Sequence, residues 1–140
     1  MVYEPGELRV VTYKNGQPWA EDVSKTTGAV AKVLLQADRS ILAANGQDLS
    51  FVTVSLLDAN GLMVPRSKNH LKFEISGPAE IVATDNGDAT DHTSFQSKER
   101  NAYNGLALVI VRTKTGQTGQ IRLRATSNGL TGAETTLRSR

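Results

Sequence analysis

The chain has 140 residues, of which 39% are hydrophobic and 21% charged, with sixteen basic and fourteen acidic side chains and no cysteine. This length is typical of one domain, or of one domain with part of another. The composition excludes a disulfide framework and a thiolate zinc site, and the scattered basic residues argue against a nucleic-acid-binding surface. No stretch approaches twenty apolar residues, so we expect no membrane-spanning segment.

The first 37 residues predict a hairpin and a further short strand. Residues 8–13 and 19–26 are rich in strand-forming types and flank Asn15-Gly16, a dipeptide typical of tight hairpin turns. Residues 32–37 form the third expected strand. Three short strands are too few to bury a core. We therefore assign residues 1–37 to the end of a preceding immunoglobulin-like domain, with an added strand pair on the following domain as the alternative.

From residue 38 onward, short apolar segments alternate with turns that contain Gly, Pro or Asn-Gly. The expected strands are 51–57, 71–76, 79–84, 106–111, 120–127 and 130–137. No window of a dozen residues has the 3.6-residue period of an amphipathic helix. The pattern predicts an all-β fold: an immunoglobulin-like Greek-key β-sandwich over residues 38–140, with an extra N-terminal hairpin.

The strand expected at 106–111 has six consecutive apolar residues, whereas an outward-facing sandwich strand usually alternates. Both of its faces are therefore expected to be buried. We predict that either the loop before it folds back over its outer face or a neighbouring domain covers that face.

The loop before this strand is about twenty residues long, well above the usual length of connections in a compact β-domain. Loops of this length are commonly functional or held down by a neighbour. Its polar and aromatic side chains form a candidate interaction loop. The candidate residues are Asp85, Asn86, Asp88, Asp91, Phe95, Gln96, Arg100 and Tyr103.

Two chemical alternatives concern the same loop. Asp85, Asp88 and Asp91 could supply oxygen ligands to calcium, but the spacing lacks the alternation of an EF-hand, so turns and strand caps are favoured. Phe95 and Tyr103 could stack on sugar rings, although we favour their packing against the sandwich. No catalytic, cofactor-binding or metal-ligating residue is assigned, because the sequence has no nucleophile elbow, phosphate loop or closely spaced histidines.

Several sequence blocks resemble one known family. They are residues 3–8 (YEPGEL), 11–16 (VTYKNG), 35–39 (LQADR), 48–54 (DLSFVTV), 73–78 (FEISGP) and the long-loop segments 85–88 (DNGD) and 100–111. From about residue 35 onward they resemble the C-terminal immunoglobulin-like fifth domain of bacterial glycoside hydrolases of family 2, of β-galactosidase type. The first two blocks resemble the closing strands of the domain before it.

The resemblance implies a non-catalytic accessory domain that supports the catalytic barrel, subunit contacts or the substrate cleft. The catalytic glutamates of that family lie on a (β/α)8 barrel to which no part of this chain corresponds, so no catalytic role is carried over. The implied partners are the remaining domains of the parent glycosidase, with an oligosaccharide as a further candidate. No cofactor, nucleic acid or membrane is implied.

The alternatives are an adhesin-type surface module, favoured by Asp58-Ala59-Asn60-Gly61 followed by Val64-Pro65, and a carbohydrate-binding module. The sequence leaves the compartment unknown. We expect the parent protein to be bacterial and either exported to the periplasm or cell surface, or cytoplasmic.

Overall fold

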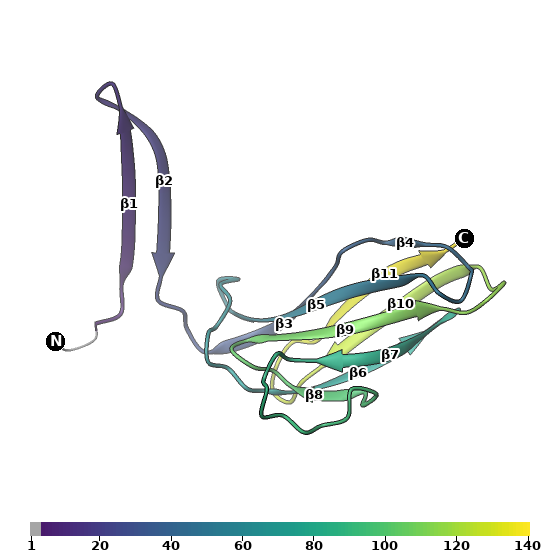
Figure 1. Ribbon diagram of the computed structural model, residues 1–140. Helices are drawn as coiled ribbons and strands as arrows, with labels where there is room; N and C mark the ends of the chain where they lie inside the picture. The colour runs from purple at the N-terminus through teal and green to yellow at the C-terminus, as the bar shows by residue number, and fades with distance from the viewer. Residues whose placement is uncertain (1–3) are drawn as a thin grey trace.

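The computed structural model describes residues 4–140, which form eleven strands and no helix (Figure 1). Within this range there is consequently no helix long and apolar enough to cross a membrane. The strands are β1 (Glu7–Lys14), β2 (Gln17–Lys25), β3 (Val30–Ala37), β4 (Ile41–Leu42), β5 (Leu49–Asp58), β6 (His70–Ser76), β7 (Ala79–Asp85), β8 (Glu99–Asn101), β9 (Leu106–Thr113), β10 (Gly119–Thr126) and β11 (Ala133–Ser139).

Nine of these strands form a β-sandwich. One sheet has the order β3-β5-β9-β7 and the other the order β4-β11-β10-β6-β8. From β5 to β10 the chain changes sheet at every connection, so most pairings join strands that are distant in sequence. The predicted all-β sandwich is confirmed.

Strand β3 belongs to this sandwich and not to the hairpin. It pairs antiparallel with β5, with Leu35 opposite Val54, and both Val33 and Leu35 are buried. The division expected at residue 37 was therefore wrong for this strand. Its partner β5 lies beyond an intervening loop, and a short strand does not reveal from its own residues which neighbour it pairs with. The assignment of the hairpin to a preceding domain stays a prediction.

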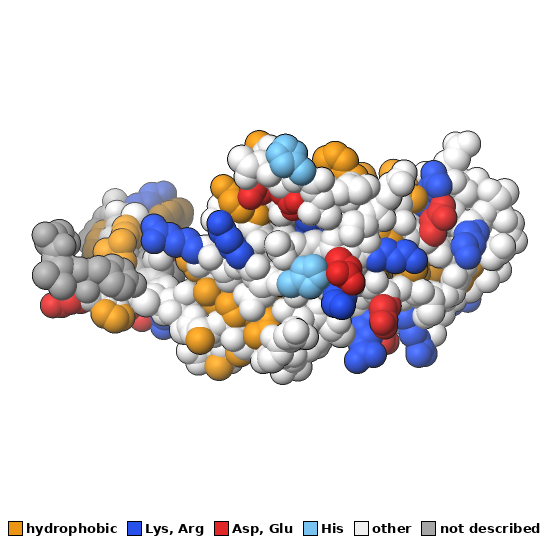
Figure 2. All heavy atoms as spheres, turned by 90° about the horizontal axis from the view of Figure 1, so that it is seen from below, with side chains coloured by type: hydrophobic (Ala, Val, Ile, Leu, Met, Phe, Trp, Pro, Cys, Tyr) orange, Lys and Arg blue, Asp and Glu red, His pale blue; other side chains and the backbone are white. Residues whose placement is uncertain are grey.

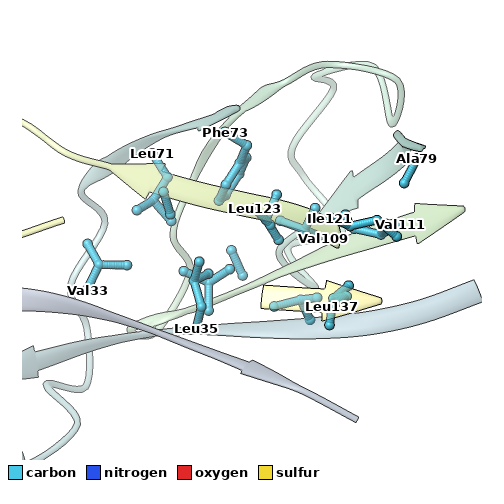
Figure 3. Packing of buried hydrophobic residues seen from close by; sticks show 14 of the residues in the cluster. Val33, Leu35, Leu71, Phe73, Ala79, Val109, Val111, Ile121, Leu123 and Leu137 are labelled. Atoms are coloured by element: carbon cyan, nitrogen blue, oxygen red, sulfur yellow. The ribbon is translucent and has the colours of Figure 1, made fainter. Parts of the chain in front are cut away.

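The core lies between the two sheets, where alternate residues of each strand point inward (Figure 3). Val52 and Val54 of β5 and Val109 of β9 meet Leu71 of β6 and Leu123 of β10 across the interface, all fully buried. Each such side chain stabilises the fold by about 2 kcal/mol through removal of apolar surface from water. The strict two-residue period of these strands thus produces a rigid scaffold for the loops.

The remaining strands, β1 and β2, form a separate two-stranded hairpin that projects from the sandwich (Figure 1). Its turn is Asn15-Gly16, with φ angles of 52° and 77°, the left-handed conformation that a tight hairpin turn requires. Four large apolar side chains on it are between 54% and 69% exposed. They are Leu8, Val10, Tyr13 and Trp19. The hairpin therefore has no core of its own.

The joint between hairpin and sandwich is short. The amide of Thr26 donates to the carbonyl of Gly6 (2.9 Å) and closes the hairpin, while the amide of Gly28 donates to Oδ2 of Asp58 in the sandwich (2.9 Å). Only Thr27 lies between these two anchors. Asp58 is buried, and its hydrogen bonds, first from Gly28 and then from the amide of Leu62, hold the pKa of its carboxyl below the ordinary value.

Candidate interaction site

The long loop connects β7, the edge strand of the four-stranded sheet, with β8, the edge strand of the five-stranded sheet. The amide of Thr84 donates to the carbonyl of Phe95 (2.6 Å), and its hydroxyl donates to the carbonyl of Ser97 (2.8 Å). These bonds fix the loop along the open side of the sandwich between the two edges. The loop therefore closes that side and protects edge groups that would otherwise be free to pair with other strands.

Arg100 in β8 organises the loop from inside. Its side chain is 1% exposed, and Nη2 donates to the carbonyls of Thr84 (2.6 Å) and Ser94 (3.0 Å). Nη1 donates to the carbonyl of Thr93 (3.0 Å) and to Oδ2 of Asp91 (3.1 Å). The planar guanidinium thus binds three backbone carbonyls and one carboxylate at once, a geometry that a lysine cannot reproduce. Arg100 anchors the loop and is not available to a partner.

Asp91 completes this network. Its Oδ1 accepts from the amide of Thr93 (2.8 Å), and its Oδ2 accepts from Nδ2 of Asn86 (2.8 Å) as well as from Arg100. Hydrogen bonds from Thr93, followed by the hydrogen bond and charge of Arg100, hold the pKa of Asp91 far below its ordinary value. The same hydrogen bonds and ion pair therefore favour the ionised form of Asp91.

The other two loop aspartates close turns of their own. Oδ1 of Asp85 accepts from the amide of Asn86 (2.7 Å), and Oδ1 of Asp88 accepts from the amide (3.0 Å) and hydroxyl (2.7 Å) of Thr90. The bonds from Thr90 lower the pKa of Asp88. Residues 4–140 contain no group of three or more His, Cys, Asp or Glu side chains arranged to hold a metal ion. This geometry matches the turn-and-cap interpretation of the three aspartates.

Phe95 and Gln96 lie on the outer side of the loop, and both are exposed. Phe95 is 62% exposed, so the expectation that it packs against the sandwich is wrong. Its ring centroid lies 5.8 Å from the guanidinium carbon of Arg100, which holds the loop beneath it. Tyr103 is half-buried in the tight turn that precedes β9. The network thus presents one aromatic side chain, Phe95, to the surroundings.

The loop does not cover the outer face of β9. Leu106 and Phe51 on that face are 38% and 42% exposed, and Leu34 of β3 is also exposed. From the sequence, either the long loop or a neighbouring domain is expected to cover this face. The exposure of these side chains rules out the loop as the cover of residues 106–111. Sequence reasoning missed Phe51 and Leu34 as surface residues, although Phe51 alternates with the inward Val52 and so had to point outward.

These observations describe an all-β domain with an ordered loop, an unsupported hairpin and an open apolar sheet face. The family model of the glycoside hydrolase family 2 C-terminal domain 5 matches residues 33–136. The chain belongs to this family. The membership confirms the resemblance inferred from the sequence, and with it the accessory-domain role. The match begins in β3 and ends in β11, so it covers the sandwich and leaves out the hairpin.

Two relatives of this family 2 domain extend the comparison. The chain is 38% identical over 128 residues to Beta-galactosidase BoGH2A from Bacteroides ovatus, an alignment that covers 91% of this chain and 15% of that protein. A crystal structure of a glycosyl hydrolase family 2 member from Bacteroides cellulosilyticus is similar with a TM-score of 0.92 and 29% identity, over 100% of this chain and 18% of that one. The chain therefore spans less than a fifth of the length of these relatives.

The adhesin alternative finds support only in architecture. A C-terminal fragment of intimin, in complex with the intimin-binding domain of its receptor, is similar over 80% of this chain with a TM-score of 0.51 and 16% identity. At that identity the similarity shows the sandwich fold alone. The family match therefore favours the family 2 accessory domain over the adhesin module that Asp58-Ala59-Asn60-Gly61 had suggested.

Proposed function

We propose that this family 2 domain serves a bacterial glycoside hydrolase of β-galactosidase type, and that its hairpin fastens it to the domain that precedes it in the parent polypeptide. The observation that carries the proposal is the hairpin, which is joined to the sandwich by a short connection yet exposes its large apolar side chains. The 38% identity to the enzyme of Bacteroides ovatus supports the β-galactosidase assignment of the parent.

An isolated two-stranded hairpin is marginally stable in water at best. Here the cross-strand ion pairs Arg9–Glu21 (2.7 Å) and Lys25–Glu7 (3.0 Å) are exposed, and exposed pairs contribute roughly 1 kcal/mol or less. Leu8 and Trp19 remain in water unless another surface covers them. The hairpin thus has the properties of strands that complete the sheet of another domain.

The similarity to the Bacteroides cellulosilyticus structure supports this role. That match covers all of this chain, hairpin included, so hairpin and sandwich superimpose together on a much longer protein. The joint at Thr27 is short, since one residue separates the last hairpin bond from the Gly28–Asp58 bond. We propose that the domain acts as a buttress whose position relative to the rest of the enzyme is fixed at this joint.

Two glutamates of the sheet surfaces, Glu80 and Glu99, form exposed ion pairs. Glu80 accepts from Arg112 (2.6 Å), and Glu99 lies 3.0 Å from Nε2 of His70 and 3.5 Å from Nζ of Lys72. Glycosidase chemistry instead needs two carboxyl groups that face each other across the scissile bond, at roughly 5–10 Å. We therefore assign hydrolysis to the remainder of the parent enzyme.

Hydrogen exchange tests the proposal directly. We expect the amides of β1 and β2 to exchange rapidly in the 140-residue chain and slowly in the parent polypeptide, because only there would the preceding domain cover them. The amides of β10 serve as the internal control, since the sandwich protects them in both. Equal, rapid exchange of the hairpin in the two proteins would refute the proposal.

A second candidate function rests on Phe95. An exposed aromatic ring on an anchored loop can stack on the apolar face of a sugar, so we propose an oligosaccharide as a further partner. Titration of the 140-residue chain with a galacto-oligosaccharide should shift the amide resonances of residues 93–97, and Phe95→Ala should remove the shift. The absence of any shift at millimolar sugar would dismiss this candidate.

A further inference from the structure

The outer face of the four-stranded sheet carries an apolar strip that Thr53 and Ser55 of β5 interrupt. Leu57 of β5 lies opposite Met63, Ser55 lies opposite Leu34 and Leu106, and Phe51 lies opposite Ile110. Residues directly opposite each other on paired strands point to the same face of a sheet. The strip therefore runs along the sheet from Met63 to Ile110. We name it the apolar strip, with members Leu34, Phe51, Met63, Leu106, Leu108 and Ile110.

Most side chains of the apolar strip are in contact with solvent. Leu34, Phe51, Met63 and Leu106 are between 38% and 43% exposed, and Leu108 and Ile110 are half-buried. At its border lie Lys32 and the ion pair of Arg112 with Glu80. An apolar centre with a charged border is the arrangement found in protein–protein interfaces.

The opposite sheet shows that the fold does not impose this pattern. On β10, Arg122 and Arg124 alternate with the buried Leu123, and Arg124 lies opposite Glu74 on β6 and Glu134 on β11. Charged side chains of both signs are spread over the sandwich surface seen in Figure 2. One sheet thus has an outer face suited to water, whereas the other has an outer face suited to a partner.

We infer that the apolar strip is a second docking surface, and that its occupant is the same domain of the parent enzyme that holds the hairpin. This inference rests on the proposed function of the hairpin and adds a second, separate contact to it. It assigns a partner to the apolar strip, most of which lies away from the hairpin.

The position of Met63, at one end of the apolar strip, indicates which domain covers the strip. Met63, together with Pro65, lines one side of a groove whose other side is the base of the hairpin, formed by Gly6, Glu7 and Leu8. A domain that covers the hairpin base therefore meets Met63, the first residue of the strip. Because only Thr27 separates the last hairpin bond from the Gly28–Asp58 anchor, that domain lies within a few ångströms of the start of β3.

Cysteine labelling can test the inference, because the chain has no cysteine of its own. We would introduce Leu106→Cys in the apolar strip, Trp19→Cys in the hairpin and Thr136→Cys on the exposed outer face of the five-stranded sheet. The rate of reaction with a maleimide at each site, read by peptide mass spectrometry, is compared between the 140-residue chain and the parent polypeptide. Leu34→Cys on the neighbouring strand repeats the test, and melting curves verify that each variant is folded.

We expect Leu106→Cys and Trp19→Cys to react at least about tenfold more slowly in the parent, and Thr136→Cys to react equally in both. Slow reaction of Trp19→Cys with unchanged reaction of Leu106→Cys and Leu34→Cys would overturn the inference and leave the proposed function intact. Unchanged reaction at all sites would overturn both.

A second copy of the chain is the competing occupant. It would make the labelling of Leu106→Cys in the 140-residue chain slow down as protein concentration rises, with a dimer in sedimentation that Leu106→Lys disrupts and Thr136→Lys does not. That result would also overturn the inference. Monomeric behaviour with concentration-independent labelling supports it.

Discussion

The sandwich and the hairpin are made of strands with similar sequences, yet they are stabilised in different ways. In β10, Ile121, Leu123 and Ala125 are fully buried, whereas Leu8 and Val10 of β1 are exposed. Strand-forming residues and good turns favour the local structure of both elements. Only the sandwich has a second layer to bury its apolar side chains, so we attribute the stability of the chain to the sandwich and assign the hairpin's stability to a partner.

The largest contrast is expected from a matched pair of truncations. Leu123→Ala should lower the free energy of unfolding by about 2–5 kcal/mol, because it leaves a cavity at a fully buried site. Val10→Ala in the hairpin should change it by less than about 0.5 kcal/mol in the 140-residue chain. Urea denaturation measures both. Similar losses from the two variants would mean that hairpin and sandwich share a core.

A smaller loss is expected from the loop anchor. Arg100→Met should cost about 3 kcal/mol, because it removes the charged partner of Asp91 and the guanidinium donor of three backbone carbonyls. Arg112→Met, which removes only an exposed ion pair with Glu80, should cost roughly 1 kcal/mol or less. Faster hydrogen exchange in residues 86–98 should accompany the first change only. A loop that remains protected in Arg100→Met would show that Arg100 is not its anchor.

Two glycines, Gly77 in the sandwich and Gly16 in the hairpin turn, allow the same comparison for backbone conformation. Gly77 has a φ of 96°, and a Cβ at this position would collide with the backbone carbonyl of Gln120 in β10. Gly77→Ala should therefore cost about 2 kcal/mol or more in global unfolding. Gly16→Ala at the hairpin turn, where a Cβ meets open space, should strain only the hairpin. Its effect should appear in the exchange of β1 and β2 and not in urea denaturation of the sandwich.

The smallest effect concerns pH. The pKa values of Asp58 and Asp91 are lowered in the folded state, so the stability they contribute is fully present above the ordinary pKa of about 4 and is lost as pH falls towards the lowered values. The urea midpoint should thus be flat near neutral pH and decrease below about pH 4. Asp91→Asn should reduce this decrease. A midpoint that rises on acidification would contradict the assignment.

The sequence was informative wherever the relevant interaction is local. The alternation of Val52, Val54 and Leu56 predicted an inward face, Asn15-Gly16 predicted the hairpin turn, and the spacing of turns predicted the sandwich. Each of these depends on the preferences of a few consecutive residues, which act before any long-range contact forms. The family blocks added the identity of the domain.

The candidate loop was only partly predictable. Its length and polarity indicated an ordered or functional segment, and Asp85 and Asp88 do close turns as favoured. Nothing in the spacing of its residues indicated that Arg100 points inward or that Phe95 points outward. The inward direction of Arg100 follows from the place of β8 at a sheet edge, where the inward side of the strand meets the carbonyls of the loop.

The amino-acid sequence by itself determined the longer strands, their inward faces, the turns and the family, but not the short edge strands β4 and β8. Only the tertiary structure decided that β3 pairs with β5, that the long loop closes the side of the sandwich between β7 and β8, and that Leu106 remains uncovered. The reason is physical: a strand's own residues determine which of its faces is apolar, but the distant segment that covers that face is selected by packing across the whole chain.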